Sequence, residues 1–303
     1  MSSFKNVFYI QAGLGVLANM FLLFFYIFII LGHRPKPADL ISCQLTFVHI
    51  MMVLIGGDML LTDLFESLNI GNDFKCKTTF YLFRVMRGLS ICITCLLSVF
   101  QAVTISPNTS LLGKFKQKIK KYMIHIFLCI WFFNLSFSTN KIFYTVGFIN
   151  VSETNQMQVT KSCSLLPMNY IIRGLIFTMS TSRDVFLVGV MLITSTYMVF
   201  FLFKHQKQCK HVHSISHLRE SPEKRATQTI LVLVVFFVVM YWVDFIISFT
   251  SYMLWMYDPV ILTVQKFMMC AYPTITVLVQ ISFDNRIIIM LKNIHLKCYQ
   301  SCY

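Results

Sequence analysis

Seven long stretches of this sequence contain no charged residue, and charged or polar segments separate them. Each stretch holds between 17 and 27 residues. Because an α-helix rises about 1.5 Å per residue, about 20 apolar residues cross the hydrocarbon core of a bilayer. The pattern therefore predicts an all-α fold, a bundle of seven transmembrane helices with the two termini on opposite sides. The stretches are residues 6–32, 40–57, 88–113, 122–140, 185–203, 226–243 and 267–283.

The predicted spans extend several of these stretches across single charges such as Asp244. The sixth span is preceded by Ser221-Pro222-Glu223, a signature of a helix start in which the serine caps the helix. We expect a single seven-helix domain over residues 1–303, with residues 284–303 as a short tail. The spans are predicted at about residues 8–31, 40–61, 79–105, 122–141, 183–203, 226–254 and 263–283.

The segment from Cys76 to Lys121 contains all the features of one complete span. After the cysteine come Arg84 and Arg87, an uncharged run over residues 88–113, and five lysines between 114 and 121. Short loops rich in lysine and arginine stay in the cytoplasm. We therefore expect Cys76 to face outward, the lysines to face inward, and the other spans to be arranged about this segment.

The composition agrees with a membrane protein and excludes an ordinary soluble domain. Hydrophobic residues make up 56% of the 303 residues and charged residues only 13%, and the mean hydropathy is +0.68. The net charge of +14 would also suit a nucleic-acid-binding protein. No zinc-finger, RNA-binding or basic-helix pattern accompanies it. We therefore attribute the basic residues to membrane topology and expect lipid, not nucleic acid, as a partner.

The distribution of basic residues predicts the orientation of the bundle. With the N-terminus outside, the inner segments hold 16 of the 26 basic residues and only four acidic ones. The remainder of the chain holds 10 basic and 8 acidic residues. This bias predicts an extracellular N-terminus and a cytoplasmic C-terminus.

Two covalent modifications follow from this topology. Cys76 and Cys163 are the cysteines that it places on the oxidising side, and we expect them to form a disulfide. Three sequons are present, at Asn108, Asn134 and Asn150. Only Asn150 falls in an outer loop, so we expect glycosylation there alone.

Charged residues in the predicted spans are candidates for function. Arg84 and Arg87 lie three residues apart and share a helix face. Asp244 is a carboxylate in the outer half of the sixth span, where a charge is costly unless it has a role. Two interpretations stay open for it: a functional site, or a structural ion pair between the third and sixth spans with Arg87 or Lys266 as partner.

The cytoplasmic segments carry two weaker signals. The third inner loop holds Cys209, His211 and two further histidines, but their spacing matches no standard zinc site, and we predict no metal or cofactor. Cys298 and Cys302 near the C-terminus are candidates for palmitoylation, with two unmodified cytosolic thiols as the alternative.

The sequence offers little support for catalysis or transport. It contains no H-E-x-x-H motif, no glycine-rich phosphate loop and no paired carboxylates within a span, so we do not expect an enzyme. It also lacks an internal repeat and a matched pair of broken helices, which are features of many transporters. Signal reception suits the predicted bundle better.

Four segments carry a resemblance to a known family. HRPKPADLI (33–41), RGLSICITCLLSVFQAVTISP (87–107), SPEKRATQTILVL (221–233) and AYPTI (271–275) resemble the vomeronasal type-1 (pheromone) receptors, which are G-protein-coupled receptors. Two positions depart from related patterns. Phe100-Gln101-Ala102 stands where rhodopsin-like receptors have Asp-Arg-Tyr, and Thr276-Val277-Leu278-Val279 stands where this family usually has Ser-Pro-Phe-Val.

The resemblance implies a chemosensory receptor of the plasma membrane that binds a pheromone-like small molecule and activates an inhibitory-type G protein. The alternatives from other classes are a small-solute transporter or channel, or a bitter-taste-type receptor. Three outer cations would suit an acidic ligand, such as a sulfated or carboxylated metabolite. Our hypothesis for the ligand cavity names Arg84, Arg87, Asp184, Asp244 and Lys266. Our hypothesis for the G-protein contact names Gln101, Lys114, Lys116, Lys118, Lys224 and Arg225.

Overall fold

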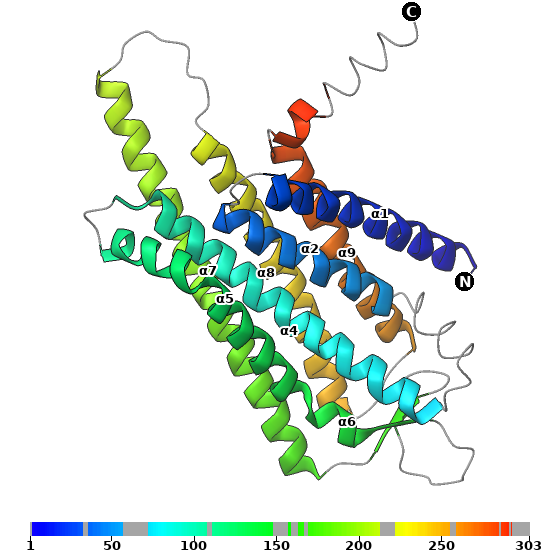
Figure 1. Cartoon of the computed structure of the whole chain (residues 1–303). Helices are drawn as coiled ribbons and strands as arrows, with labels where there is room; N and C mark the ends of the chain where they lie inside the picture. The colour runs from blue at the N-terminus through cyan, green and yellow to red at the C-terminus, as the bar shows by residue number, and fades with distance from the viewer. Residues whose placement is uncertain are drawn as a thin grey trace, which may run out of the picture.

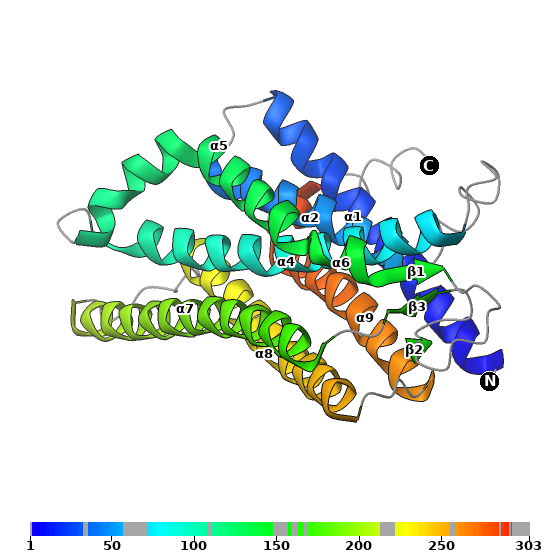
Figure 2. The same ribbon diagram turned by 90° about the horizontal axis from the view of Figure 1, so that it is seen from below.

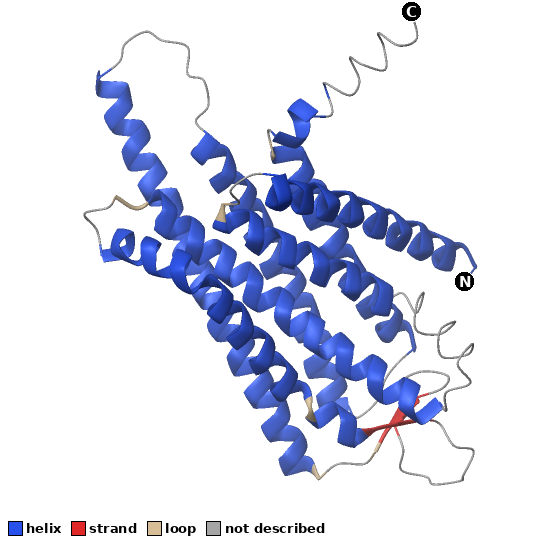
Figure 3. Cartoon of the chain, in the orientation of Figure 1, coloured by secondary structure: helices blue, strands red, loops and turns tan. Residues whose placement is uncertain are grey.

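The computed structural model shows a bundle of long helices closed at one end by a small sheet (Figures 1 and 3). It describes residues 2–32, 36–56, 72–107, 111–147, 157–158, 163–166, 169–212, 222–254, 259–284, 286–290 and 292. Seven of the helices within these ranges have 20 or more residues. They are α1 (Ser2–Gly32), α2 (Pro37–Gly56), α4 (Asn72–Ile105), α5 (Leu111–Ser138), α7 (Tyr170–Val212), α8 (Pro222–Leu254) and α9 (Pro259–Phe283).

These helices have the length and composition of membrane spans. Five of them, α1, α2, α4, α5 and α7, contain a segment long and apolar enough to cross a bilayer. Within α8 and α9 the apolar segments are shorter, Val234–Thr250 and Phe267–Phe283. The prediction of a helical membrane bundle is confirmed.

Helix starts follow local sequence signals. Helices α2, α8 and α9 each begin at a proline, whose fixed φ suits the first helical position and whose missing N–H costs nothing there. At the start of α2 the Asp39 carboxylate also accepts a hydrogen bond from the backbone N–H of Lys36 at 3.2 Å, as in a capping box.

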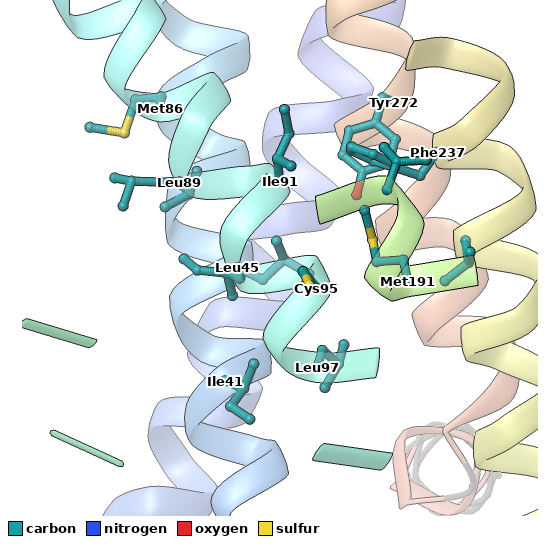
Figure 4. Close-up of a cluster of buried hydrophobic side chains, with 14 of the residues drawn as sticks. Ile41, Leu45, Met86, Leu89, Ile91, Cys95, Leu97, Met191, Phe237 and Tyr272 are labelled. Carbon is teal, nitrogen blue, oxygen red and sulfur yellow. The ribbon is translucent and has the colours of Figure 1, made fainter. Parts of the chain in front are cut away.

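Helix α4 lies at the centre of the bundle (Figure 2). It packs against α2, α5, α7 and α8, and its span is the most buried of the five. The main hydrophobic core forms around it, with side chains from α2, α7, α8 and α9 (Figure 4). The expectation that the other spans are arranged about this segment is confirmed for α2, α5, α7 and α8, whereas α1 packs against α2 and α9.

A short sheet joins the start of α4 to the segment before α7. After α6 (Asn140–Tyr144), strands β1 (Thr145–Gly147), β2 (Met157–Gln158) and β3 (Cys163–Leu165) pair antiparallel in the order β1–β3–β2. Cys163 in β3 forms a disulfide with Cys76 in α4, with 5.7 Å between the Cα atoms, as predicted. The sequence did not predict these strands, because two or three residues are too few to show an alternating pattern. We call this end of the bundle the disulfide end and the opposite end the lysine end.

Two helices begin earlier than the charge pattern suggested. Helix α7 starts at Tyr170, well before residue 183, because Arg183 and Asp184 lie inside the bundle and not at its edge. Helix α5 starts at Leu111, so the lysines from 114 to 121 lie in its first turns and not in a loop. Lysine is a good helix former, so this continuation is consistent with its propensity.

Candidate ligand cavity

Arg87 of α4 is held between two carboxylates from different helices. Its Nη2 atom lies 2.5 Å from Oδ2 of Asp244 in α8 and 3.5 Å from Oδ2 of Asp184 in α7. The Arg87 side chain is 15% exposed, and both aspartates are less exposed still. A buried cation is costly unless it is paired. The ion pairs therefore satisfy Arg87 and connect α4, α7 and α8.

Arg183 completes this network on the α5 side. Its Nε and Nη2 atoms donate to Oδ1 of Asp184 at 2.9 and 2.6 Å, and Nη1 donates to the Asn134 amide oxygen at 3.4 Å. The guanidinium also lies 4.7 Å from the ring centroid of Phe137. At Gly88 any side chain would displace the Asn134 amide oxygen and crowd the Arg183 guanidinium that it contacts.

Among the described residues, the network carries one more positive than negative charge. Arg84, three residues before Arg87, donates to the hydroxyl of Ser180 in α7. The cluster therefore contains three arginines (84, 87 and 183) and two aspartates (184 and 244), which leaves a net charge of one positive. In the apolar interior of a membrane protein, this excess favours the approach of an anion.

A cavity opens beside Arg87 between α2, α4, α8 and α9. Its volume is about 50 Å³, and it is partly open to the outside. Its polar lining consists of Arg87 and Ser90 of α4, Asp244 of α8 and Gln265 of α9, and the Gln265 amide donates to Oδ1 of Asp244 at 2.9 Å. The rest is apolar or aromatic: Met52, Ile91, Phe237, Met240, Tyr241, Ile247, Met268, Met269 and Tyr272. Such a lining suits a small molecule with an apolar body and one polar group.

The structure brings together four of the five residues predicted for the ligand site. Arg84, Arg87, Asp184 and Asp244 belong to one network, but only Arg87 and Asp244 line the cavity. The Lys266 side chain lies outside the described part of the structure. Asp244 pairs with Arg87 between two helices, as the structural interpretation expects, and it also faces the cavity, so its functional role stays a prediction.

Several lining residues were missed by the sequence analysis. Gln265, Ser90 and Tyr272 are uncharged, and such residues occur in many membrane helices without a special role. Arg183 was not among the residues predicted for the site. The one signal that could have pointed to it is its adjacency in the chain to Asp184, a carboxylate predicted for the site.

A second cluster of charges lies at the lysine end. Nη2 of Arg286 lies 2.9 Å from Asp39 of α2 and 3.0 Å from Asp284, just after α9. Partial burial lowers the pKa of Arg286, whereas hydrogen bonds and charge from Asp284 and Asp39 raise it, and the net direction of the pKa is upward. The guanidinium is therefore a permanent cation that links α2 to the end of α9.

The remaining predicted sites are only partly described. Gln101 is half-buried near the end of α4, Lys116 is partly exposed and Lys118 is exposed. The side chains of Lys114, Lys224 and Arg225 lie outside the described part, as do Asn150, Cys298 and Cys302. Within the described residues no group of three or more histidine, cysteine, aspartate or glutamate side chains is placed to hold a metal ion. Most of the histidine-rich loop is not among them.

Comparison with known proteins identifies the family. Residues 2–293 match the profile of the vomeronasal organ pheromone receptor family. Vomeronasal type-1 receptor 90 of Rattus norvegicus is 40% identical over 292 residues, which cover 96% of this chain and 94% of that protein. Vomeronasal type-1 receptor 48 of Mus musculus is 36% identical over 293 residues, 96% of each chain. The chain therefore belongs to the vomeronasal organ pheromone receptor family, whose members are multi-pass chemosensory receptors of the G-protein-coupled class.

Proposed function

We propose that this receptor binds a small molecule with an apolar body and a single acidic group in the cavity beside Arg87, and that binding activates an inhibitory-type G protein. The observation that carries the proposal is the position of Arg87. It lines the cavity and at the same time holds α7 and α8 through Asp184 and Asp244. A ligand that reaches Arg87 acts directly on the contacts between three helices.

The charge balance of the network supports an acidic ligand. The two aspartates do not neutralise the three arginines, so one carboxylate or sulfate makes the cluster neutral. The same group competes with Asp244 for Arg87. A ligand that binds better when Arg87 and Asp244 separate shifts the population towards that arrangement of α4 and α8.

Features at the two ends of the bundle support an orientation with the N-terminus outside the cell and the C-terminus in the cytoplasm. Disulfides persist in oxidising compartments, which favours an extracellular position for Cys76 and Cys163. Lys116, Lys118 and the neighbouring lysines of α5 favour the cytoplasm for the opposite end. In our proposal the G protein contacts that end through Gln101, Lys114, Lys116, Lys118, Lys224 and Arg225. Asn150 is glycosylated, and Cys298 and Cys302 carry palmitoyl chains.

The test is G-protein activation in cells that express the receptor with an inhibitory-type α subunit. Sulfated and carboxylated small molecules are compared with neutral analogues of the same carbon skeleton, and surface delivery is measured by antibody labelling. We expect an acidic compound to give a dose-dependent response that its neutral analogue lacks. Arg87→Lys keeps the charge but loses the forked geometry, so it should reduce potency about tenfold.

Lys77→Gln is the matched control for this experiment. Lys77 pairs with Asp73 in the first turns of α4 and does not line the cavity. The substitution removes one positive charge at the same end of the bundle and should leave potency unchanged. An equal potency of acidic and neutral analogues on the unmodified receptor would contradict the acidic ligand. Solute flux through the receptor without G-protein activation would instead favour a transporter.

A further inference from the structure

Tyr272 of α9 closes the cavity on the side of the lysine end. Along α9 the lining residues run from Gln265 to Tyr272, and along α8 they run from Ile247 back to Phe237. The rings of Tyr272 and Phe237 lie side by side, with 5.3 Å between their centroids (Figure 4). A ligand that fills the cavity to its inner end therefore meets the Tyr272 ring.

Tyr272 contacts three neighbouring helices at this point. Besides Phe237 of α8, its ring makes an edge contact with His49 of α2 at 5.2 Å, and its hydroxyl lies 3.1 Å from Oγ1 of Thr94 in α4. Thr94 donates its own hydrogen to the carbonyl of Ser90 at 2.7 Å, so the Tyr272 hydroxyl is the donor to Thr94. The position of one side chain on the cavity wall therefore depends on four helices.

Helix α9 is weakened next to Tyr272. Pro273 has no N–H, so the carbonyl of Met269, four residues earlier, has no helical donor there. Met269 itself lines the cavity. On the other side, the carbonyl of Pro273 accepts a hydrogen bond from the Asn19 amide of α1 at 3.3 Å. The interruption in the hydrogen-bond ladder of α9 thus coincides with the cavity wall.

Hydroxyl groups continue from this point along α4 towards the lysine end. Ser98, one turn after Thr94, lies 2.7 Å from the hydroxyl of Thr194 in α7. Further along, Ser106 lies 2.9 Å from the hydroxyl of Tyr197 in α7. These two contacts join α4 to α7 between Tyr272 and the lysine end.

We infer that Tyr272 is the positioning residue through which occupancy of the cavity changes the packing of α9 against α2, α4 and α8. The inference rests on the proposed function in one respect, since it takes this cavity as the ligand site. An occupant that displaces the Tyr272 ring breaks its hydrogen bond to Thr94. The inner part of α9, beyond Pro273, then moves relative to α4.

The experiment uses a tethered occupant, so it needs no natural ligand. Met268 lines the cavity one helical turn before Tyr272. The thiolate introduced by Met268→Cys takes the benzylthio group of benzyl methanethiosulfonate, forming a mixed disulfide and releasing methanesulfinate. The full-length receptor is held in lipid nanodiscs, and amide hydrogen exchange of residues 274–283 is measured by mass spectrometry. Unsubstituted receptor treated with the same reagent accounts for labelling of native cysteines.

We expect the tethered benzylthio group to speed amide exchange in this segment about tenfold, because the hydrogen bond between Tyr272 and Thr94 is then broken. In Met268→Cys/Tyr272→Phe the reagent should react equally well but change exchange by less than about twofold. Thr94→Val, combined with Met268→Cys, removes the hydrogen-bond acceptor while the Tyr272 side chain stays. It should likewise abolish the increase in amide exchange. Tyr81→Phe, which breaks a hydrogen bond from α4 to the Leu135 carbonyl outside the cavity, should retain it.

Nucleotide exchange by an inhibitory-type G protein is measured on the same samples, which separates the inference from the proposed function. A change in amide exchange that depends on Tyr272, together with no nucleotide exchange by the G protein, supports the inference and contradicts the proposed coupling. The same change in amide exchange with and without the Tyr272 hydroxyl overturns the inference, whatever the G protein does. No change in either background also overturns it, because occupancy then does not reach α9.

Discussion

Two arginines in this receptor each lie between two aspartates, and their surroundings give them different roles. Arg87 is 15% exposed, and its partners Asp184 and Asp244 come from α7 and α8. Arg286 is 43% exposed, and one of its partners, Asp284, is two residues away in the chain. The buried cluster joins distant helices beside a cavity, whereas the exposed cluster fastens the end of α9 to α2.

In both places one arginine lies between two aspartates, but the contribution of these ion pairs to stability depends on how far solvent reaches them. Water and salt screen Arg286, so its ion pairs contribute little to stability. Arg87 is shielded, so the removal of one partner leaves a buried charge without compensation. A ligand that binds at Arg87 can therefore change the contacts among α4, α7 and α8, whereas the ion pairs of Arg286 only link α2 to the end of α9.

The largest effect is expected from Arg87→Gln. It leaves Asp184 and Asp244 buried with one shared cation fewer, and it should lower the free energy of unfolding by about 3–5 kcal/mol. The measurement is thermal or denaturant unfolding of purified receptor in nanodiscs. Arg87→Gln/Asp244→Asn should be less destabilised than the sum of the two single variants, because the double change removes both charges of the pair. Additive effects would mean that Arg87 and Asp244 do not interact.

The location of these two clusters could be predicted only in part. Arg87 and Asp244 stand out because charges are rare in apolar spans, so the sequence pointed to both. Their pairing with Asp184 requires α4, α7 and α8 to meet, which no local pattern contains. Gln265 and Tyr272 could not be singled out for the same reason, since packing alone brings these polar side chains to the cavity.

The fold was easier to predict than the site because its signals are local. Apolar runs indicate the helices, and the sidedness of Cys76 and Cys163 indicates the disulfide. Helix α7 begins at Tyr170, before the fifth span that was predicted from residue 183, where the charged pair Arg183-Asp184 stands. The bundle instead supplies partners for both residues, so the helix continues through them.

The next largest effect is expected from Val277→Pro, near the exposed cluster. Val277 is fully buried and packs with Leu22, Phe25 and Ile287, and its N–H faces the carbonyl of Pro273. Proline removes that donor within α9 and should destabilise the receptor by about 3 kcal/mol. Val277→Ala keeps the N–H and separates the lost packing from the lost hydrogen bond. Unchanged unfolding of Val277→Pro would show that α9 tolerates a second proline here.

Asp39→Ala should have a smaller effect. The Asp39 carboxylate accepts from the Lys36 N–H and from Arg286, so the change removes the acceptor at the start of α2 and its link to α9. A cap of this kind contributes about 1 kcal/mol, and we expect a loss of that order in the free energy of unfolding. Asp284→Ala is the matched control, because it removes the other carboxylate on Arg286 without touching the start of α2. If Asp284→Ala were the more destabilising of the two, the cap would not be the main contribution of Asp39.

The smallest effect is expected from Arg286→Gln. Its ion pairs lie where water and ions reach the guanidinium, so their loss should cost less than about 1 kcal/mol. Salt tests the comparison directly. Raising the ionic strength from about 0.01 to 1 M shortens the Debye length from about 30 to 3 Å, so the difference between Arg286→Gln and the unmodified receptor should vanish. The difference for Arg87→Gln should persist, because salt screens buried ion pairs much less than exposed ones. A salt-resistant effect at Arg286 would mean that the two clusters are equally shielded, and the contrast in their roles would then have to come from the cavity alone.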